Sequence, residues 1–343
     1  MMNDHVIEWS TKNVLVTGVN GFVGGNIAKD LVMRGANVVG LVRNLDQRSL
    51  LYFENIDKAI TIVVGDLCDR ALLERIMVEQ MIDVVFHLAA QVEVGVGVTS
   101  PYTTWETNVR GTYTLMESIR QYAPAVKAVV VASTDKAYGS YPIDMMPYQE
   151  DYPLRPQYPY DTSKACSDLI AQSYATELFE IPVVITRFCN IYGPGQLNFS
   201  ALIPDAISGA LKCSEFRPRS NGEYLRDFLF ISDVIELYIK IAEKIISDPD
   251  RLRGEIFNAG TCEPRTVRSI IEEIYRQCDN GSDLELVLAQ MESCETTGEI
   301  KTQYMDYRKA ERFFGWSPTT NFHDGIANTI QWFRHYLSIQ HQR

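Results

Sequence analysis

The first 190 residues alternate short apolar, β-branched runs with segments of helical periodicity. Strands are predicted at residues 14–16, 37–42, 60–64, 84–88, 128–132 and 183–187, and helices at 22–34, 72–80, 103–122 and 160–179. Apolar strands separated by helices form β-α-β units, in which helices cover both faces of a parallel sheet. The pattern therefore predicts a doubly wound α/β fold with right-handed crossovers.

The pattern changes after about residue 190, where turn residues crowd together. Glycine, proline, asparagine and aspartate gather at 192–195, 220–222 and 248–250, and helices are predicted at 203–211, 233–246, 267–277 and 307–314. We expect residues 1–189 to form the larger domain and residues 190–343 a smaller C-terminal α/β substrate domain. The chain is expected to cross between them more than once, with 227–260 returning to the first domain.

Length and charge limit the class of protein. A chain of 343 residues, 46% hydrophobic and 22% charged, is ordinary for a globular protein of about two domains. The net charge of −12 argues against a general nucleic-acid binder, which presents a basic face to phosphates. The sequence contains no run of about 18 apolar residues, so no membrane span is predicted. Seven cysteines without a C-x-x-C pattern are typical of reduced thiols in a cytoplasmic protein, and five isolated histidines predict no metal site.

The turn after the first predicted strand carries a glycine pattern that favours dinucleotide binding. It reads Thr17-Gly18-Val19-Asn20-Gly21-Phe22-Val23-Gly24, a G-x-x-G-x-x-G variant that leads into a helix. Gly18 permits the tight turn, Gly21 lets the backbone approach a pyrophosphate, and Gly24 lets the helix pack on the strand. The predicted cofactor-binding residues here are Gly18, Asn20, Gly21, Phe22, Val23 and Gly24, where free N–H groups at the helix start favour an anion.

The choice of cofactor depends on the end of the second predicted strand. An NAD site usually has an acidic residue there for the ribose 2′-hydroxyl, and this chain has Arg43. A guanidinium suits a 2′-phosphate, so the sequence favours NADP and leaves NAD open. Arg43 stacking on adenine, or facing water, is the alternative. Asp66-Leu67 follow the third strand, where the carboxylate can reach the adenine amine or serve as a turn residue.

Tyr160 and Lys164 lie four residues apart in a predicted helix and therefore share one face. A nearby ammonium favours the phenolate, so Lys164 is expected to lower the pKa of Tyr160. Tyr160 is then a candidate base for an alcohol that loses a hydride to nicotinamide. Thr134, at the end of a predicted strand, is expected to hydrogen-bond the reacting oxygen.

Together these motifs resemble the extended short-chain dehydrogenase/reductase family, in its nucleotide-sugar branch, over nearly the whole chain. The resemblance rests on Thr17 to Gly24, Asp66-Leu67, His87-Leu88-Ala89-Ala90-Gln91, Thr107-Asn108-Val109-Arg110-Gly111-Thr112, Tyr160 to Lys164, Arg187-Phe188-Cys189-Asn190-Ile191-Tyr192-Gly193-Pro194-Gly195 and Arg226-Asp227-Phe228. It implies a Rossmann domain with a nicotinamide cofactor, a C-terminal domain for a nucleotide sugar, and a homodimer formed through helices 103–122 and 160–179.

The same resemblance implies further binding residues. Cofactor contacts would come from Asp66, Leu67, Leu88, Ala89, Ala90, Gln91, Asn108, Tyr160 and Lys164, and substrate contacts from Gln91, Thr134, Asn190, Ile203 and Arg226. Arg226 would clamp a phosphate, unless it forms an ion pair with Asp227 or Asp233 instead. Residues 213–224 show no pattern that is specific for one nucleobase. The resemblance favours CDP, on the Asp135-Lys136 segment described next, and leaves GDP, UDP and dTDP open.

Asp135-Lys136 is the segment that separates possible reactions within the family. An ionisable pair after Thr134 resembles the 4,6-dehydratases, and the Asp-Lys form is most similar to CDP-glucose 4,6-dehydratases. Oxidation at C4 makes the C5 hydrogen acidic, and losing water across C5–C6 then needs a base and an acid. We assign Lys136 as the C5 base and Asp135 as the acid for the 6-hydroxyl. The assignment can be reversed within such a coupled pair, and a structural salt bridge is the alternative.

The sequence therefore predicts an NAD(P)-dependent nucleotide-sugar 4,6-dehydratase, a lyase that forms a 4-keto-6-deoxy sugar. The alternative is a nucleotide-sugar epimerase that uses the same Tyr160 and Lys164, and a non-catalytic dinucleotide sensor is less consistent with these residues. All predicted ligands are anions, whereas the chain carries a net charge of −12. Binding is thus expected to depend on a few local donors: the Gly18 to Gly24 turn, Arg43 and Arg226.

Overall fold

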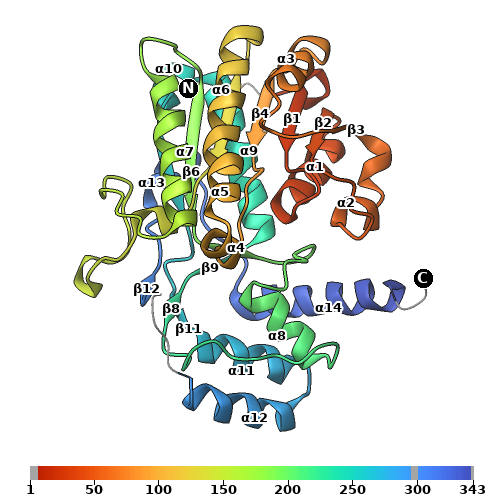
Figure 1. Cartoon of the computed structure of the whole chain (residues 1–343), viewed down its shortest axis with the longest axis vertical. Coiled ribbons are helices and arrows are strands. Elements are labelled where there is room, and N and C mark those ends of the chain that lie inside the picture. The colour runs from red at the N-terminus through yellow and green to blue at the C-terminus, as the bar shows by residue number, and fades with distance from the viewer. Residues whose placement is uncertain (1–6, 295–299, 341–343) are drawn as a thin grey trace.

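The computed structural model describes residues 7–294 and 300–340, and its largest element is a seven-stranded sheet (Figure 1). The strands are β1 (Asn13–Thr17), β2 (Asn37–Val42), β3 (Thr61–Val64), β4 (Val84–His87), β5 (Ala128–Ala132), β6 (Val183–Phe188) and β10 (Ile256–Ala259). They lie in the order β10-β6-β5-β4-β1-β2-β3, and every neighbouring pair is parallel. The predicted doubly wound parallel sheet is confirmed. Its strand order reverses between β1 and β4, where ligand crevices open in such sheets.

Helices cover both faces of this sheet. They are α1 (Phe22–Met33), α3 (Arg70–Glu79), α6 (Gly111–Tyr122), α7 (Pro159–Ala175) and α9 (Ile231–Ser247). Successive side chains of a strand point to opposite faces. Val14 and Val16 of β1 accordingly pack into the core that includes α1 and α9, and Leu15 packs into the core that includes α3 and α6. Figure 1 shows α6 and α7 side by side on one face and α9 behind the sheet.

The prediction of one regular helix over residues 103–122 is wrong, because the segment consists of three successive helical pieces. The chain forms α5 (Pro101–Thr104), a π-helical segment η3 (Trp105–Arg110) and then α6. Gly111 lies where the two segments meet, and a Cβ there would lie 2.5 Å from Cδ2 of Leu67. Close packing against the third βα connection thus coincides with the change in helix type. The predicted helix 160–179 ends earlier, at Ala175, because Thr176 is extended.

The C-terminal region contains small sheets and helices, in the lower part of Figure 1. β8 (Leu225–Arg226) pairs with β11 (Arg265–Thr266) and β12 (Thr302–Gln303), and β7 (Asn190–Tyr192) pairs with β9 (Phe228–Phe230). The helices are α8 (Leu202–Ala210), α10 (Pro249–Leu252), α11 (Val267–Gln277), α12 (Gly281–Glu292), α13 (Arg308–Phe314) and α14 (Phe322–Gln340). The predictions missed α12 and α14.

The boundary between the two regions is crossed by the chain. β10 pairs with β6 as an edge strand of the main sheet, and α9 packs against β5. α13 in turn packs against β10. Because segments from beyond residue 190 complete the sheet, the division into residues 1–189 and 190–343 describes ligand-binding roles and stays a proposal.

Short elements connect these larger ones. They are η1 (Trp9–Thr11), α2 (Leu50–Phe53), η2 (Ile56–Ala59), α4 (Val94–Thr99), η4 (Asp135–Tyr138) and η5 (Ile143–Met145). The most important is η4, which follows β5 at the carboxyl edge of the sheet and begins with the predicted acid–base pair. None of the helices in the described ranges combines the length and apolar character needed to cross a membrane.

Candidate active site

The loop between β1 and α1 forms a tight backbone cradle. Gly18 has a φ of +72°, and a Cβ there would lie 2.8 Å from Cα of Ala89. A Cβ on Gly24 would lie 2.2 Å from the carbonyl oxygen of Gly18, so only glycine lets α1 start this close to the loop. The N–H of Gly21 donates to the same oxygen at 2.9 Å. This geometry fits the pyrophosphate of a dinucleotide, which binds against exposed backbone at a helix N-terminus.

The loops after β2 and β3 lie at the same edge of the sheet. Asn20 of the glycine loop donates through Nδ2 to the carbonyl oxygen of Asn44 at 2.9 Å, which ties the two loops together. Arg43, directly before Asn44, is exposed. Asp66 is also exposed, and its carboxylate accepts the N–H of Cys68 at 2.8 Å. The predicted cofactor-selecting residues therefore line one rim.

The carboxyl end of β4 is held to β1 by a buried hydroxyl. Thr17 Oγ1 accepts the N–H groups of Leu88 and Ala89, both at 3.1 Å, and hydrogen-bonds Nδ1 of His87 at 2.9 Å. Nε2 of His87 lies 3.0 Å from Oγ1 of Thr112. Burial, followed by the charge of Lys164, lowers the pKa of His87 to about 3, so the ring is neutral. His87 is therefore a buried, neutral residue that joins β1 to α6 through hydrogen bonds to Thr17 and Thr112.

Asn108, predicted to contact cofactor, is buried and fully engaged with protein groups. Its Oδ1 accepts the N–H of Gln91 at 2.7 Å, and its Nδ2 donates to the carbonyl oxygen of Gln91 at 3.0 Å. Nδ2 also donates to Oγ of Ser163 at 2.8 Å. Asn108 thus fixes the loop after β4 against α7. The role that these contacts support is to position Gln91.

Tyr160, Lys164 and Thr134 come together at the carboxyl edge of β5. Tyr160 and Lys164 occupy successive turns of α7, and Lys164 is 7% exposed. The Lys164 ammonium donates to the carbonyl oxygen of Ala132, two residues before Thr134. Tyr160 hydrogen-bonds to Thr134. The local sequence explains the helix start, because Pro159 stands at the first helical position, where it needs no N–H partner.

The electrostatics of this group differ from the prediction. Burial, Asp135 and Asp161 raise the pKa of Tyr160, and the hydrogen bond to Thr134 only partly offsets them. The expected lowering of the Tyr160 pKa is therefore wrong, chiefly because burial disfavours the charged phenolate. Burial lowers the pKa of Lys164 to about 8, although Asp168 opposes this shift.

Asp135 and Lys136 open the short helix η4 beside these residues. Asp135 is 2% exposed, and its Oδ1 accepts the hydroxyl of Thr134 at 3.0 Å. Its Oδ2 is buried without a hydrogen-bond partner among the described residues. The backbone N–H of Lys136 donates to Oγ1 of Thr134 at 3.3 Å. Within the described ranges no ion pair joins Asp135 to Lys136, so the alternative of a structural salt bridge lacks support.

Asp161 is a candidate that the sequence reasoning missed. It directly follows Tyr160 in α7 and is buried. Burial raises the pKa of its carboxyl to about 6, Lys136 lowers it, and Asp135 raises it. A carboxyl adjacent to the tyrosine of the Y-x-x-x-K pattern was the available signal, but its burial next to Lys136 depends on how α7 packs on η4.

Asn190 and Arg226, two predicted substrate residues, lie in the small strands β7 and β8. Asn190 donates through Nδ2 to the carbonyl oxygen of Asp227 at 3.2 Å. Arg226 in β8 places its guanidinium 5.4 Å from the ring centroid of Tyr224 and donates to the carbonyl oxygen of Leu225. The charges of Asp135 and Arg226 both act on the pKa of Tyr148, which burial raises.

Two predicted contact residues lie in the hydrophobic core. Ile203, in α8, is 1% exposed, and Leu67 is buried against Gly111. Their side chains pack against other protein groups, so the predicted ligand contacts stay predictions. Asp227, the alternative partner of Arg226, accepts hydrogen bonds from Thr261 N–H at 3.0 Å and from its hydroxyl at 2.5 Å. Among the described residues no cluster of histidine, cysteine or carboxylate side chains is arranged to hold a metal ion.

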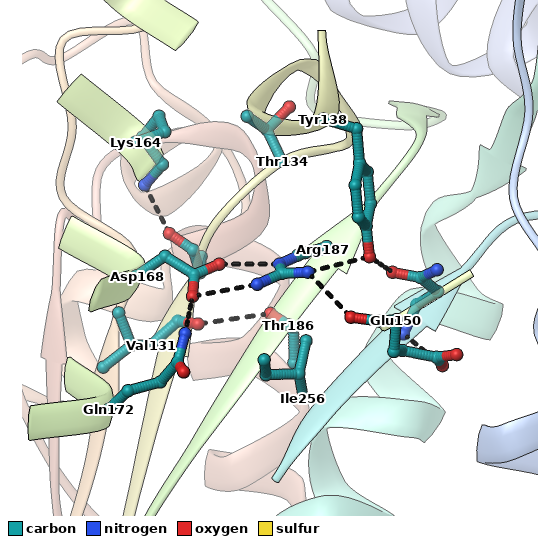
Figure 2. Close-up of polar contacts among 12 residues, drawn as sticks. Val131, Thr134, Tyr138, Glu150, Lys164, Asp168, Gln172, Thr186, Arg187 and Ile256 are labelled. Carbon is teal, nitrogen blue, oxygen red and sulfur yellow. Dashed lines mark hydrogen bonds and ion pairs between the residues drawn. The ribbon is translucent and has the colours of Figure 1, made fainter. Parts of the chain in front are cut away.

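A buried polar network lies beneath these catalytic candidates (Figure 2). Arg187 of β6 pairs with Asp168 of α7, one turn after Lys164, and contacts Tyr138, the last residue of η4. The sequence reasoning used Arg187 only as part of a motif and gave Asp168 and Tyr138 no role.

Comparison with known proteins places this site in a family. The sequence profile of the GDP-mannose 4,6 dehydratase family matches residues 15–329. The chain belongs to this family. The dTDP-glucose 4,6-dehydratase of Xanthomonas campestris pv. campestris is 31% identical over 340 residues, which cover 93% of this chain and 92% of that protein. The predicted membership of the nucleotide-sugar dehydratase branch is confirmed.

Solved structures of the family share the fold over nearly the whole chain. UDP-glucose 4-epimerase of Thermotoga maritima, solved with UDP-glucose, gives a TM-score of 0.82 at 26% identity and covers 95% of this chain and 99% of its own. The dTDP-glucose 4,6-dehydratase of Bacillus anthracis, in complex with NAD, gives a TM-score of 0.80 at 27% identity, covering 95% and 97%. The chain is thus similar to both dehydratases and epimerases.

Proposed function

We propose that this chain is a nicotinamide-dependent nucleotide-sugar 4,6-dehydratase, which converts a nucleoside-diphosphate hexose into its 4-keto-6-deoxy derivative. The observation that carries the proposal is the buried Asp135 carboxylate, which bonds Thr134 through one oxygen and keeps the other without a partner among the described residues. Thr134 also bonds Tyr160. An epimerase needs no acid at this point, whereas elimination of a hydroxyl does.

The glycine cradle fits the cofactor that this reaction requires. Gly18, Gly21 and Gly24 would hold the pyrophosphate against exposed backbone, and Tyr160 and Lys164 would stand at the reacting end. When bound, the dinucleotide supplies the acceptor for the hydride from C4 of the sugar and the donor of the same hydride to C6. No cofactor is consumed.

The residues of the chain manage the protons. Tyr160 takes the proton of the C4 hydroxyl while Thr134 hydrogen-bonds the same oxygen. This step requires the phenol to lose its own proton first, against the raised pKa that burial gives it. Lys136 removes the C5 hydrogen as a proton once C4 is a carbonyl, and Asp135 donates a proton to the leaving 6-hydroxyl, so the sugar loses one water. When the hydride reaches C6, the protonated Lys136 returns its proton to C5, which completes the 4-keto-6-deoxy sugar. The charge of Lys136 lowers the pKa of the Asp161 carboxyl, which burial raises, so the two groups interact electrostatically.

The experiment that tests the proposal is incubation with CDP-, UDP-, GDP- and dTDP-hexoses, followed by mass spectrometry. Loss of one water from one of them, without net reduction of the nicotinamide, is expected. Asp135→Asn and Lys136→Ala should each block elimination while the cofactor is still reduced. Tyr141→Phe is a matched control, since its hydroxyl donates to Pro153 and not to the catalytic candidates. Normal dehydration by both site variants would refute the assigned roles.

An epimerase is the second candidate, because the Thermotoga maritima epimerase has the same fold over 95% of the chain. Tyr160, Lys164 and Thr134 serve both reactions, so the cofactor step cannot separate them. A product of unchanged mass and altered stereochemistry would establish the epimerase and exclude the dehydratase.

The finer choices are also proposals. We propose NADP as cofactor, supported by the exposed guanidinium of Arg43 at the rim, although the Bacillus anthracis relative was solved with NAD. CDP stays the preferred nucleotide on the Asp135-Lys136 pattern. Arg226 and Asn190 are proposed to bind the diphosphate region.

Assembly and location rest on surface features. We propose a homodimer through α6 and α7, whose exposed Tyr113 and Leu169 leave apolar surface for a second copy. A cytoplasmic location is supported by the seven free cysteines, because reduced thiols are typical of that compartment.

A further inference from the structure

Arg187 and Asp168 form an ion pair whose side chains are only 3% and 0% exposed. The pairing is bidentate, with Nε to Oδ2 at 2.7 Å and Nη2 to Oδ1 at 3.2 Å. Nη1 of Arg187 donates to the hydroxyl of Tyr138 at 2.9 Å and to the carbonyl oxygen of Glu150 at 3.2 Å. The guanidinium is therefore nearly saturated, as a buried charge must be to persist.

The two sides of this pair lead to the two halves of the candidate active site (Figure 2). Asp168 lies one turn after Lys164 in α7, so it belongs to the helix that carries the tyrosine–lysine pair. Tyr138 ends η4, whose first residue is Asp135. Within residues 7–294 and 300–340, Arg187 of β6 is the one side chain that bonds both Asp168 and Tyr138.

Tyr138 extends the network to the edge of the sheet. Its hydroxyl donates to Oδ1 of Asn258 in β10 at 2.8 Å, and its ring stacks on Tyr148 at 4.9 Å. The guanidinium carbon of Arg187 lies 4.9 Å from the centroid of the Tyr138 ring. The end of η4 is thus fixed by hydrogen bonds on one side and by ring packing on the other. Any displacement of Arg187 is transmitted to the turn that bears Asp135.

The pair also determines the charge near Lys164. Burial lowers the pKa of the Lys164 ammonium, and the Asp168 carboxylate of α7, which is paired with Arg187 of β6, opposes this shift. The charge of Lys164 in turn helps to keep His87 of β4 neutral. Buried ion pairs contribute little net stability, because desolvation offsets their attraction. The position of the Arg187–Asp168 pair, between α7 and η4, is therefore a better guide to its role than its contribution to stability.

We propose that Arg187 and Asp168 are positioning residues of the active site: they fix α7, with Tyr160 and Lys164, against the turn that carries Asp135 and Lys136, and set the charge that Lys164 experiences. The kinetic part rests on the proposed dehydratase function. The electrostatic part concerns the protein alone.

The positioning role is tested with Tyr138→Phe, which removes only the hydroxyl between Arg187 and Asn258. Tyr141→Phe is the matched control, because Tyr141 packs against the same Tyr148 but its hydroxyl donates to Pro153 instead. The rate of elimination, monitored as loss of water from the sugar, should fall about tenfold in Tyr138→Phe and stay unchanged in Tyr141→Phe. The rate of cofactor reduction, monitored by the absorbance of the nicotinamide, should be unchanged in both variants. Equal rates of elimination in the two variants would overturn the positioning role.

The electrostatic role is tested on the cofactor-free protein with Asp168→Asn and Arg187→Lys. Asp168→Asn removes the anion and leaves the arginine cation, so the pKa of Lys164 should fall. Arg187→Lys keeps the charge but cannot bond Asp168 and Tyr138 together, so the pKa of Lys164 should be unchanged while elimination slows. The measurement is a titration of 15N-labelled lysine side chains by NMR, with Lys164→Arg to assign the signal.

The outcomes separate this inference from the proposed function. An unchanged pKa of Lys164 in folded Asp168→Asn would overturn the electrostatic role, whatever reaction the protein catalyses. Absence of water loss from every nucleotide hexose in the unmodified protein would refute the dehydratase, and the titration would still decide the electrostatic role. If Asp168→Asn fails to fold, as judged by circular dichroism, Arg187→Lys and Tyr138→Phe still decide whether the pair positions the site.

Discussion

The two ends of the candidate active site are built on different physical principles. The cofactor end is shaped by backbone: Gly18 and Gly24 meet at distances that no side chain would permit. The reaction end is shaped by buried charge, with Asp135, Asp161 and Lys164 all removed from water. Substitutions at the first end should act through steric conflict, and those at the second through protonation.

The comparison is most sharply tested by Tyr160→Phe. Loss of the hydroxyl should slow cofactor reduction about 10³-fold, because the C4 hydroxyl loses its proton acceptor. Folding and dinucleotide affinity should be retained, since the ring still fills the same space. Tyr174→Phe, at the far end of α7, is the control: its hydroxyl bonds Glu117 at 3.2 Å. Equal loss of activity in the control would mean that the helix, and not the hydroxyl, is responsible.

At the cofactor end the corresponding change is Gly24→Ala. The added Cβ would lie 2.2 Å from the carbonyl oxygen of Gly18. The loop must then move, at a cost of about 3 kcal/mol in unfolding free energy, with loss of dinucleotide binding. Gly281→Ala, where no atom lies within 4 Å of the new Cβ, should change neither. Thermal unfolding and a fluorescence titration with the dinucleotide measure both effects, and a stable, binding Gly24→Ala protein would contradict the steric account.

Buried charge at the reaction end predicts a pH dependence of stability. The pKa of Lys164 falls from 10.5 to about 8 on folding, so between these values the unfolded chain binds more protons than the folded one. Stability therefore rises with pH across this window, by about 1.4 kcal/mol per pKa unit of difference. Urea unfolding of the unmodified protein and of Lys164→Met over this range isolates the contribution. Parallel curves for the two proteins would show that Lys164 titrates normally.

The smallest effect is expected at the rim of the cofactor site. Arg43→Gln removes an exposed cation that is proposed to meet the ribose 2′-phosphate. Affinity for NADP should fall about fivefold, because an exposed charge contributes at most about 1 kcal/mol. Affinity for NAD should stay constant. If both cofactors bind Arg43→Gln as they bind the unmodified protein, cofactor choice lies elsewhere in the loop.

Local pattern was sufficient for much of the fold. The apolar runs of β1, β2 and β5 each form a strand of the sheet, and the glycine spacing marks a turn whose steric demands are met within a few residues. The same reasoning failed at residues 105–110, where a π-helical segment replaces regular helix. Hydrophobic periodicity does not report a change of this kind, and the segment ends at Gly111, which packs closely on Leu67 from another βα unit.

The sequence alone determined the chemistry available to this protein: a dinucleotide turn, a tyrosine–lysine pair and an acid–base pair after Thr134. These follow from residue type and short spacing, which fix what a group can donate or accept. Only the tertiary structure decided the pKa shifts of those groups and the buried hydrogen bonds that hold them in place. Burial, followed by the charges of Asp135 and Asp161, raises the pKa of Tyr160 where a fall was expected. Arg187 bonds Asp168 and Tyr138, which lie 19 and 49 residues away in the sequence. Desolvation and long-range pairing depend on which segments pack together, and local sequence carries no record of that.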